Sequence, residues 1–299
     1  MSTNTSRGEQ TVRVGDIDLC YETFGERSNP PLLLVMGLAS QMVLWEDEFC
    51  ERLASGGFWV IRFDNRDCGR STILRDKAVP TRMQLLLRQP RGAAYALEEM
   101  ADDAAGLLDA LEVESAHVVG ASMGGMIAQL IAIRHPDRVR SLVSIMSTTG
   151  DRRVGRPSPR IVPLLLRRVP RDREGYLRDF AAAYKAIGSP RYYNEARSRA
   201  IGERCYERGI HPAGSARQLA AIVTAKDRTE QLRRLDVPAT VIHGEVDPLV
   251  NRSGGRATAA AIPGARLVMI PAMGHDLPPE LWDQVIEEIE ATAGRYDRA

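Results

Sequence analysis

The sequence predicts an α/β protein with a mostly parallel, doubly wound sheet of eight strands, flanked by helices and interrupted by an inserted helical cap. Short runs rich in Val, Ile and Leu recur along the chain, which is typical of strands buried on both faces of a parallel sheet. Segments with helical periodicity lie between these runs, and this alternation indicates right-handed crossovers between parallel strands. The alternation fails over residues 149–234, which favours an insertion between two strands.

The composition is that of an ordinary globular protein. The chain has 299 residues, enough for one extended fold with an insertion. Hydrophobic residues at 44% and charged residues at 26% exclude a disordered or collagen-like chain. Lys and Arg number 40 and Asp and Glu number 39, so the formal net charge is +1. The chain therefore has no overall positive electrostatic field that would hold it on nucleic acid or on an anionic membrane.

The sheet is expected to begin with an antiparallel hairpin at its edge, formed by residues 12–14 and 17–24 around Gly15-Asp16. Six buried strands are expected to follow, at residues 32–36, 58–63, 116–119, 141–146, 239–243 and 266–270. Helices are expected at residues 45–53, 97–111, 123–133 and 281–289. Ligand sites of doubly wound sheets lie at the carboxyl ends of the strands, so the functional site is expected there.

The inserted segment, residues 149–234, is predicted to be a mostly helical cap. It divides the core into a first part, residues 1–148, and a second part, residues 235–299. Between residues 151 and 178 the segment holds nine Arg against two Asp and one Glu. A solvated surface is the favoured interpretation of these arginines. The alternatives are an anionic substrate or an anionic lipid surface, the latter with residues 161–168 as an interfacial patch.

The strongest motif is Gly120-Ala121-Ser122-Met123-Gly124, a G-x-S-x-G pattern between a predicted strand and a predicted helix. A serine on such a sharp turn takes a strained conformation that holds its hydroxyl clear of the sheet, and the two glycines relieve backbone clashes. The N–H groups and dipole of the helix favour negative charge beside the serine. The alternative is a chance match in which the serine only caps the helix.

A serine nucleophile needs a base and the base needs an orienting carboxylate. His275 is the expected base, because its loop follows the last predicted strand and reaches the carboxyl edge of the sheet. Asp247, just after strand 239–243, is the expected carboxylate, with Glu245 as the competitor. The order Ser122, Asp247, His275 is the nucleophile–acid–histidine order of one fold family. Structural roles are expected for the other histidines, which are His117, His135, His211 and His243.

The sequence gives no sign of a cofactor or a metal site. Nucleotide-binding, zinc and calcium motifs are absent, so none is expected. The cysteines have no C-x-x-C pair and no metal-ligand spacing, and we expect reduced thiols at Cys20, Cys50, Cys68 and Cys205. The start has no apolar signal segment and no apolar run approaches the ~18 residues of a membrane span. The expected location is the cytoplasm, and both a monomer and a homo-oligomer stay open.

The chain resembles the α/β-hydrolase family over nearly its whole length. The likeness rests on the hairpin start, the G-x-S-x-G motif, the Asp247 and His275 loops, Met36-Gly37-Leu38, and residues 64–71, Asp-Asn-Arg-Asp-Cys-Gly-Arg-Ser. Within the family it is similar to bacterial serine esterases of the aclacinomycin-methylesterase-like and mycobacterial LipG-like kind. Residues 33–37, 64–67 and 120–129 carry that likeness.

By this resemblance the oxyanion hole is formed by the backbone N–H groups of Leu38 and Met123. Met36 stands where relatives often carry His, which leaves this backbone role untouched. Residues 64–71 are similar to a structural turn that organises loops near the site. Direct catalysis by Arg66 or Cys68 is the minor alternative, since an activated thiol needs a base or a cationic neighbour.

These observations favour a serine carboxylesterase that hydrolyses a small-molecule ester through an acyl-enzyme on Ser122. A lipase, a polyketide methylesterase, a lactone or carbon–carbon bond hydrolase, or a perhydrolase would use the same triad. A ligand receptor without turnover is disfavoured, because all three triad candidates are present. The candidates for an apolar pocket in the cap are Leu164, Leu165, Leu166, Phe180, Tyr184, Tyr192 and Tyr193.

Overall fold

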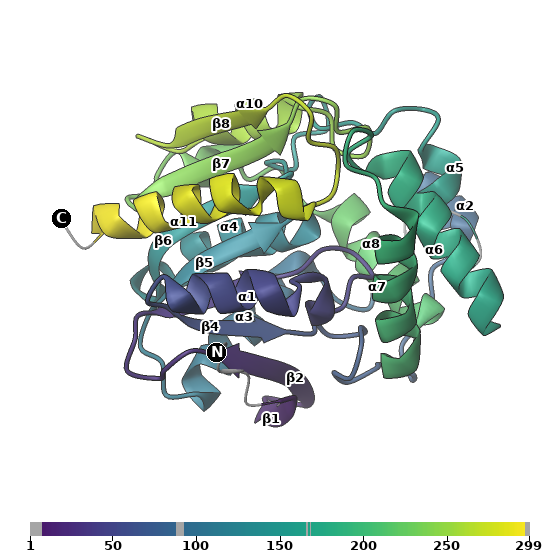
Figure 1. The fold of residues 1–299 in the computed structure, drawn as a ribbon, viewed down its shortest axis with the longest axis horizontal. Helices are drawn as coiled ribbons and strands as arrows, with labels where there is room; N and C mark the ends of the chain where they lie inside the picture. Colours follow the sequence, from purple (N-terminus) through teal and green to yellow (C-terminus); the bar gives the residue numbers. More distant parts are fainter. Residues whose placement is uncertain (1–7, 88–92, 166, 168, 297–299) are drawn as a thin grey trace.

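The computed structural model describes residues 8–87, 93–165, 167 and 169–296, which fold around one eight-stranded sheet (Figure 1). The strands are β1 Gln10–Val14, β2 Ile17–Phe24, β3 Pro31–Val35, β4 Trp59–Phe63, β5 Ala116–Ala121, β6 Val139–Ile145, β7 Ala239–Gly244 and β8 Arg266–Ile270. Their order in the sheet is β1-β2-β4-β3-β5-β6-β7-β8. β2 is antiparallel to β1 and to β4, and the remaining neighbours are parallel. The predicted sheet and its edge hairpin are confirmed.

The helices include the four that the sequence predicts and several that it does not. The α-helices are α1 Asp47–Ser55, α2 Arg82–Leu86, α3 Leu97–Ala110, α4 Met123–Arg134, α5 Val162–Leu165, α6 Arg173–Ile187, α7 Glu195–Arg208, α8 Pro212–Thr224, α9 Thr229–Leu232, α10 Ser253–Ala261 and α11 Trp282–Tyr296. Short 3-10 helices are η1 Met42–Leu44, η2 Pro136–Arg138 and η3 Pro279–Leu281. Among the described residues, no helix has the length and apolar character needed to cross a membrane.

The core lies on both faces of the sheet, because successive strand side chains point to opposite sides. Leu33 and Val35 of β3 pack in one cluster with α3 and α4. Leu32 and Leu34 pack in the other cluster, with apolar side chains of α1 and α11. Figure 1 shows α1 and α11 on the near face of the sheet. These two layers fix the carboxyl ends of the parallel strands at one edge.

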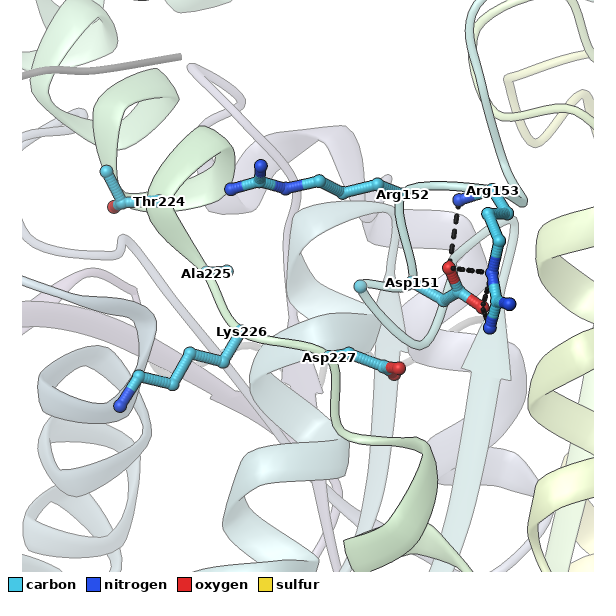
Figure 2. A pocket seen from close by; sticks show the side chains of 8 residues that line it. Asp151, Arg152, Arg153, Thr224, Ala225, Lys226 and Asp227 are labelled. Carbon is cyan, nitrogen blue, oxygen red and sulfur yellow. Dashed lines mark hydrogen bonds and ion pairs between the residues drawn. The ribbon is translucent and has the colours of Figure 1, made fainter.

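Helices α5 to α9 lie between β6 and β7, and this part of the chain contains no strand among its described residues. Figure 1 shows α5 to α8 gathered beyond one end of the sheet. The segment leaves and rejoins the core at one place, where Arg228 N–H donates to the Thr149 carbonyl at 2.9 Å and the Arg228 guanidinium donates to the Thr148 carbonyl at 3.0 Å. A pocket of about 480 Å³ lies at this base, between residues 150–153 and 224–227 (Figure 2).

A buried ion pair joins α8 to the loop after β4. The Arg217 guanidinium donates to both carboxylate oxygens of Asp67, at 2.7 and 2.6 Å, and the two side chains are 1% and 0% exposed. Asp67 also accepts hydrogen bonds from the Tyr95 hydroxyl and the Leu74 N–H. Burial alone raises the pKa of Asp67, but the hydrogen bonds from these three groups hold it below its ordinary value. Asp67 is therefore ionised in the folded protein, and its buried charge is compensated by the Arg217 guanidinium.

Replacing Arg217 with methionine is expected to lower the free energy of unfolding by about 3–5 kcal/mol, because Asp67 is left buried without its counter-charge. The measurement is the midpoint of urea denaturation. The matched control is Arg153→Met. Arg153 pairs with Asp151 (Figure 2), but its own side chain is 83% exposed, so the midpoint of this variant should stay at the wild-type value. Equal midpoints for Arg217→Met and the wild type would contradict this assignment.

Candidate active site

Ser122 lies on the turn between β5 and α4, with backbone angles φ 57° and ψ −119°. A positive φ is costly for a residue with a side chain and marks a strained turn. The turn closes because its neighbours are glycines. A Cβ on Gly120 would lie 2.1 Å from the Gly124 carbonyl oxygen, and one on Gly124 would lie 2.0 Å from the Val35 carbonyl oxygen of β3. Only glycine fits at both positions, which is the physical reason for the motif.

Three side chains from three loops meet at the carboxyl end of the sheet. His275 follows β8, and its Nε2 lies 2.9 Å from the Ser122 Oγ. Its Nδ1 lies 2.7 Å from Oδ2 of Asp247, which follows β7. Asp247 is 5% exposed and His275 is 8% exposed. In this row the imidazole is placed to accept the serine proton at Nε2 and to donate its Nδ1–H to the carboxylate.

Asp247 is held in place by the backbone that follows it. Its Oδ1 accepts hydrogen bonds from the N–H groups of Leu249 and Val250, each at 2.8 Å. The other oxygen is thereby directed at His275, and the competitor Glu245 is not the partner of that imidazole. His243 lies 3.6 Å from the same oxygen, but its Nε2–H donates to the Val250 carbonyl at 2.8 Å. Burial lowers the pKa of His243, which favours a neutral, structural imidazole.

The remaining histidines bond elsewhere. His117 pairs with the Ser141 hydroxyl inside the sheet, His135 with the Asp102 carboxylate, and His211 with the Gly69 carbonyl.

The loop at residues 64–71 holds structural contacts rather than a reactive group. The Arg66 guanidinium donates to both oxygens of Asp103, at 2.5 and 2.6 Å. Asp64 accepts hydrogen bonds from the backbone N–H groups of Met42 and Arg70. Cys68 is buried, and burial raises the pKa of its thiol well above the ordinary value. A protonated, buried thiol is a poor nucleophile.

The loop after β3 passes directly against Ser122. A Cβ on Gly37 would lie 3.1 Å from the Ser122 Cβ. Leu38 comes next in this loop, and Met123 is the first residue of α4. Within the described part of the chain, neither the Leu38 nor the Met123 N–H donates to another group. Two free backbone donors therefore lie beside the serine, where a developing oxyanion would be stabilised.

Gln218 of α8 fixes the loop after β3, a role that no motif in the sequence predicts. The Ala39 N–H donates to its Oε1 at 2.8 Å, and its Nε2 donates to the Arg66 carbonyl at 2.8 Å. Gln218 is fully buried. Helix α8 thus positions the backbone next to Leu38.

A second unpredicted contact clamps the loop that carries His275. The Ser189 N–H and hydroxyl donate to Oδ1 of Asp276, at 2.8 and 2.5 Å. The Ser189 Oγ also accepts from the Gly274 N–H at 2.9 Å, and the His275 N–H donates to the Ile187 carbonyl at 2.8 Å. The turn after α6 therefore holds the histidine loop on both sides of His275.

A cavity of about 880 Å³ surrounds the serine, and we call it the Ser122 cavity. Ser122 and His275 line it together with aromatic side chains of α6. Tyr176, Phe180 and Tyr184 form a row along that helix, with ring centroids 5.8 and 4.7 Å apart. No cluster of three or more metal-ligating side chains occurs among the described residues.

The predicted pocket residues divide into three groups. Leu164, Phe180 and Tyr184 line the Ser122 cavity. Tyr192 packs against the core instead, and the Tyr193 hydroxyl donates to the Ala181 carbonyl. Leu166 and the Leu165 side chain lie outside the described residues, as does Arg168 of the arginine-rich stretch.

Comparisons with known proteins identify the family of the chain. Residues 30–280 match the family described as the alpha/beta hydrolase fold. The chain is 31% identical over 284 residues to rhodomycin D methylesterase DauP of Streptomyces sp. strain C5, covering 88% of this chain and 90% of that protein. It is 30% identical over 285 residues to rhodomycin D methylesterase DnrP of Streptomyces peucetius, with 88% and 90% covered.

A solved structure shares the architecture along nearly the whole chain. The enol-lactonase from Burkholderia xenovorans LB400 superposes with a TM-score of 0.74 at 25% identity, covering 95% of this chain and 100% of that one. These relatives are hydrolases, and two of them are named methylesterases, which supports ester hydrolysis in general. The chain belongs to the α/β-hydrolase family.

Proposed function

We propose that this protein is a carboxylic-ester hydrolase that works through an acyl-enzyme on Ser122. The observation that carries the proposal is the hydrogen-bonded row from Ser122 through His275 to Asp247, with distances of 2.9 and 2.7 Å. The backbone N–H groups of Leu38 and Met123 are assigned as the oxyanion hole. Rhodomycin D methylesterases at 31% and 30% identity support an ester as the substrate.

In the proposed acylation step, each group of the site has one role. The Ser122 oxygen attacks the carbonyl carbon of the ester while His275 Nε2 takes the hydroxyl proton. The carbonyl oxygen becomes an oxyanion and accepts hydrogen bonds from the Leu38 and Met123 amides, each worth about 2.7–4 kcal/mol in such sites. The imidazolium, stabilised by Asp247, then gives its proton to the leaving oxygen, and the alcohol departs.

Deacylation repeats the same steps with water. His275 takes a proton from water as the water oxygen attacks the acyl carbon, and the returned proton restores the Ser122 hydroxyl as the carboxylic acid leaves.

Residues 149–234 are proposed as the cap of this enzyme, over a core of residues 1–148 and 235–299. The cap supplies the aromatic row of the Ser122 cavity, formed by Tyr176, Phe180 and Tyr184. Flat aromatic groups stack well on such side chains. This row, together with the methylesterase names of the relatives, favours a methyl ester of an aromatic acid as a second, narrower candidate.

A substrate panel tests the proposed function. p-Nitrophenyl esters of rising acyl length, methyl esters of polycyclic aromatic acids and a lactone are offered to the purified protein. We expect turnover of the p-nitrophenyl esters with an initial burst from the acyl-enzyme. A preference for aromatic methyl esters supports the narrower candidate. Turnover of the lactone alone, or tight binding without any turnover, would overturn the ester hydrolase.

Ser189→Ala is expected to lower kcat by about 10-fold with little change in KM, because the loop carrying His275 loses its clamp while the Ser122 cavity keeps its lining. The matched control is Ser198→Ala, because Ser198 is a buried residue of α7 whose hydroxyl donates to the carbonyl of Asn194, the N-cap residue of the same helix. Steady-state kinetics on one p-nitrophenyl ester measures both values. An unchanged kcat, or an equal loss in the control, would show that the clamp does not position His275.

A further inference from the structure

Half of the exposed large apolar side chains come from one short segment. Eight large apolar side chains are exposed among the described residues, and four of them lie between residues 79 and 87. Met83 and Leu87 are each 63% exposed. We call the following set the apolar patch: Val79, Met83, Leu86, Leu87 and Val169. An exposed cluster of this kind marks an interaction surface, whereas single exposed apolar residues do not.

The spacing of the apolar residues along helix α2 places three members of the apolar patch on one exposed face. A capping box between Thr81 and Gln84 fixes the start of the helix. Leu85 turns inward and is 7% exposed. Met83, Leu86 and Leu87 stand at positions i, i+3 and i+4, so they share the outer face.

Cations surround the apolar patch. Arg75, Lys77 and Arg82 are exposed, and Asp76 is the one acidic residue between residues 75 and 87. On the cap side, Arg171 is exposed as well. Within the described part of the chain, Arg75, Arg82 and Arg171 form no ion pair, whereas Lys77 lies 3.9 Å from Asp76. Exposed apolar side chains accompanied by exposed cations fit a layer of anionic headgroups over hydrocarbon.

The apolar patch borders the opening of the Ser122 cavity. Arg82, Val169 and Arg171 line that cavity and are also exposed, so they lie where it meets solvent. Leu85 lines the same cavity from α2. Figure 1 shows α2 at the end of the molecule where α5 to α8 gather, and α2 contacts α8. A molecule bound at the apolar patch therefore lies next to the entrance that leads to Ser122.

We propose that the apolar patch and its cations dock this protein on an anionic lipid surface, with the opening of the Ser122 cavity facing the lipid. A second copy of the chain is disfavoured, because a symmetric contact through this face would bring Arg75, Lys77 and Arg82 of both copies together. Within the described part of residues 161–168, where the sequence suggests an interfacial alternative, Ile161 is 3% exposed and Val162 and Leu164 are only half-exposed, so none of these three belongs to the exposed apolar set. The docking surface does not depend on the ester chemistry.

The test is binding of the full chain to vesicles. Sedimentation with vesicles of phosphatidylcholine and phosphatidylglycerol is compared with vesicles of phosphatidylcholine alone. We expect clear binding to the anionic vesicles and about 10-fold weaker binding of the variant Met83→Ser/Leu86→Ser/Leu87→Ser. Arg75→Glu/Lys77→Glu should also lose binding to the anionic vesicles. The matched control is Val246→Ser/Leu267→Ser, which removes exposed apolar side chains elsewhere and should bind like the wild type.

Equal binding of the triple serine variant and the wild type would overturn the proposal, as would no binding to anionic vesicles. A wild-type dimer that the triple variant converts to a monomer, measured by light scattering, would identify the apolar patch as a self-association contact instead. Thermal unfolding checks that each variant is folded. Turnover of a water-soluble p-nitrophenyl ester separates the two proposals. If neither the wild type nor any variant turns the ester over, but vesicle binding is lost only in the variants of the docking surface, the ester hydrolase is wrong and the docking surface is supported.

Discussion

Replacing Ser122 with alanine is expected to lower kcat/KM for a p-nitrophenyl ester by about 10⁶-fold, with the protein still folded. The substitution removes the oxygen that attacks the carbonyl carbon, while His275 and Asp247 keep their mutual hydrogen bond of 2.7 Å. Residual hydrolysis should come only from binding and from the backbone donors. Steady-state rates, with the melting temperature as a check on the fold, measure this effect.

The control for this prediction is Ser55→Ala. Ser55 is exposed at the end of α1, and its hydroxyl donates to the Glu51 carbonyl at 2.8 Å. Its loss should leave kcat/KM at the wild-type value. A Ser122→Ala protein that keeps wild-type turnover would show that another group is the nucleophile.

Replacing Asp247 with asparagine is expected to lower kcat by about 10⁴-fold. The N–H groups of Leu249 and Val250 need an acceptor, so the asparagine oxygen should take the place of Oδ1. Its amide nitrogen then faces His275 Nδ1 and donates to it. This places the imidazole proton on Nε2, which can no longer accept the proton of Ser122.

The neighbouring carboxylate gives a matched control. Glu245→Gln changes the competitor acid in the same loop, and we expect it to retain turnover close to that of the wild type, because His275 bonds to Asp247. The turnover rates of both variants on one ester show which carboxylate orients His275. If Glu245→Gln lost as much activity as Asp247→Asn, the carboxylate would have been assigned to the wrong residue.

Strand positions and motif residues were open to prediction because their signals are local. Buried parallel strands appear as short apolar runs, and the carboxyl ends of such strands converge on one edge. Ser122, Asp247 and His275 each follow a parallel strand, so the sheet brings the three residues to the same edge. The glycines of the turn have an equally local cause, since a Cβ on Gly120 or Gly124 would collide with backbone.

Contacts of helices α6 and α8 with the core had no such signal. Gln218 and Arg217 lie on α8 and Ser189 follows α6, in sequences that show no motif, and their partners are far away along the chain. Their roles depend on how the helices pack on the core. Helices α2 and α10 were also missed, because α2 has five residues and α10 opens with Ser-Gly-Gly and has few large apolar side chains.

Whether Ser122 is the nucleophile is tested most directly by covalent labelling with a fluorophosphonate, followed by mass spectrometry of the digested protein. We expect one modified peptide, with the added phosphonyl group on Ser122. No such peptide is expected in Ser122→Ala, and labelling should be much slower in His275→Ala, where no imidazole accepts the hydroxyl proton. A label on a different residue, or undiminished labelling of Ser122→Ala, would contradict the central claim that Ser122 is the nucleophile activated by His275.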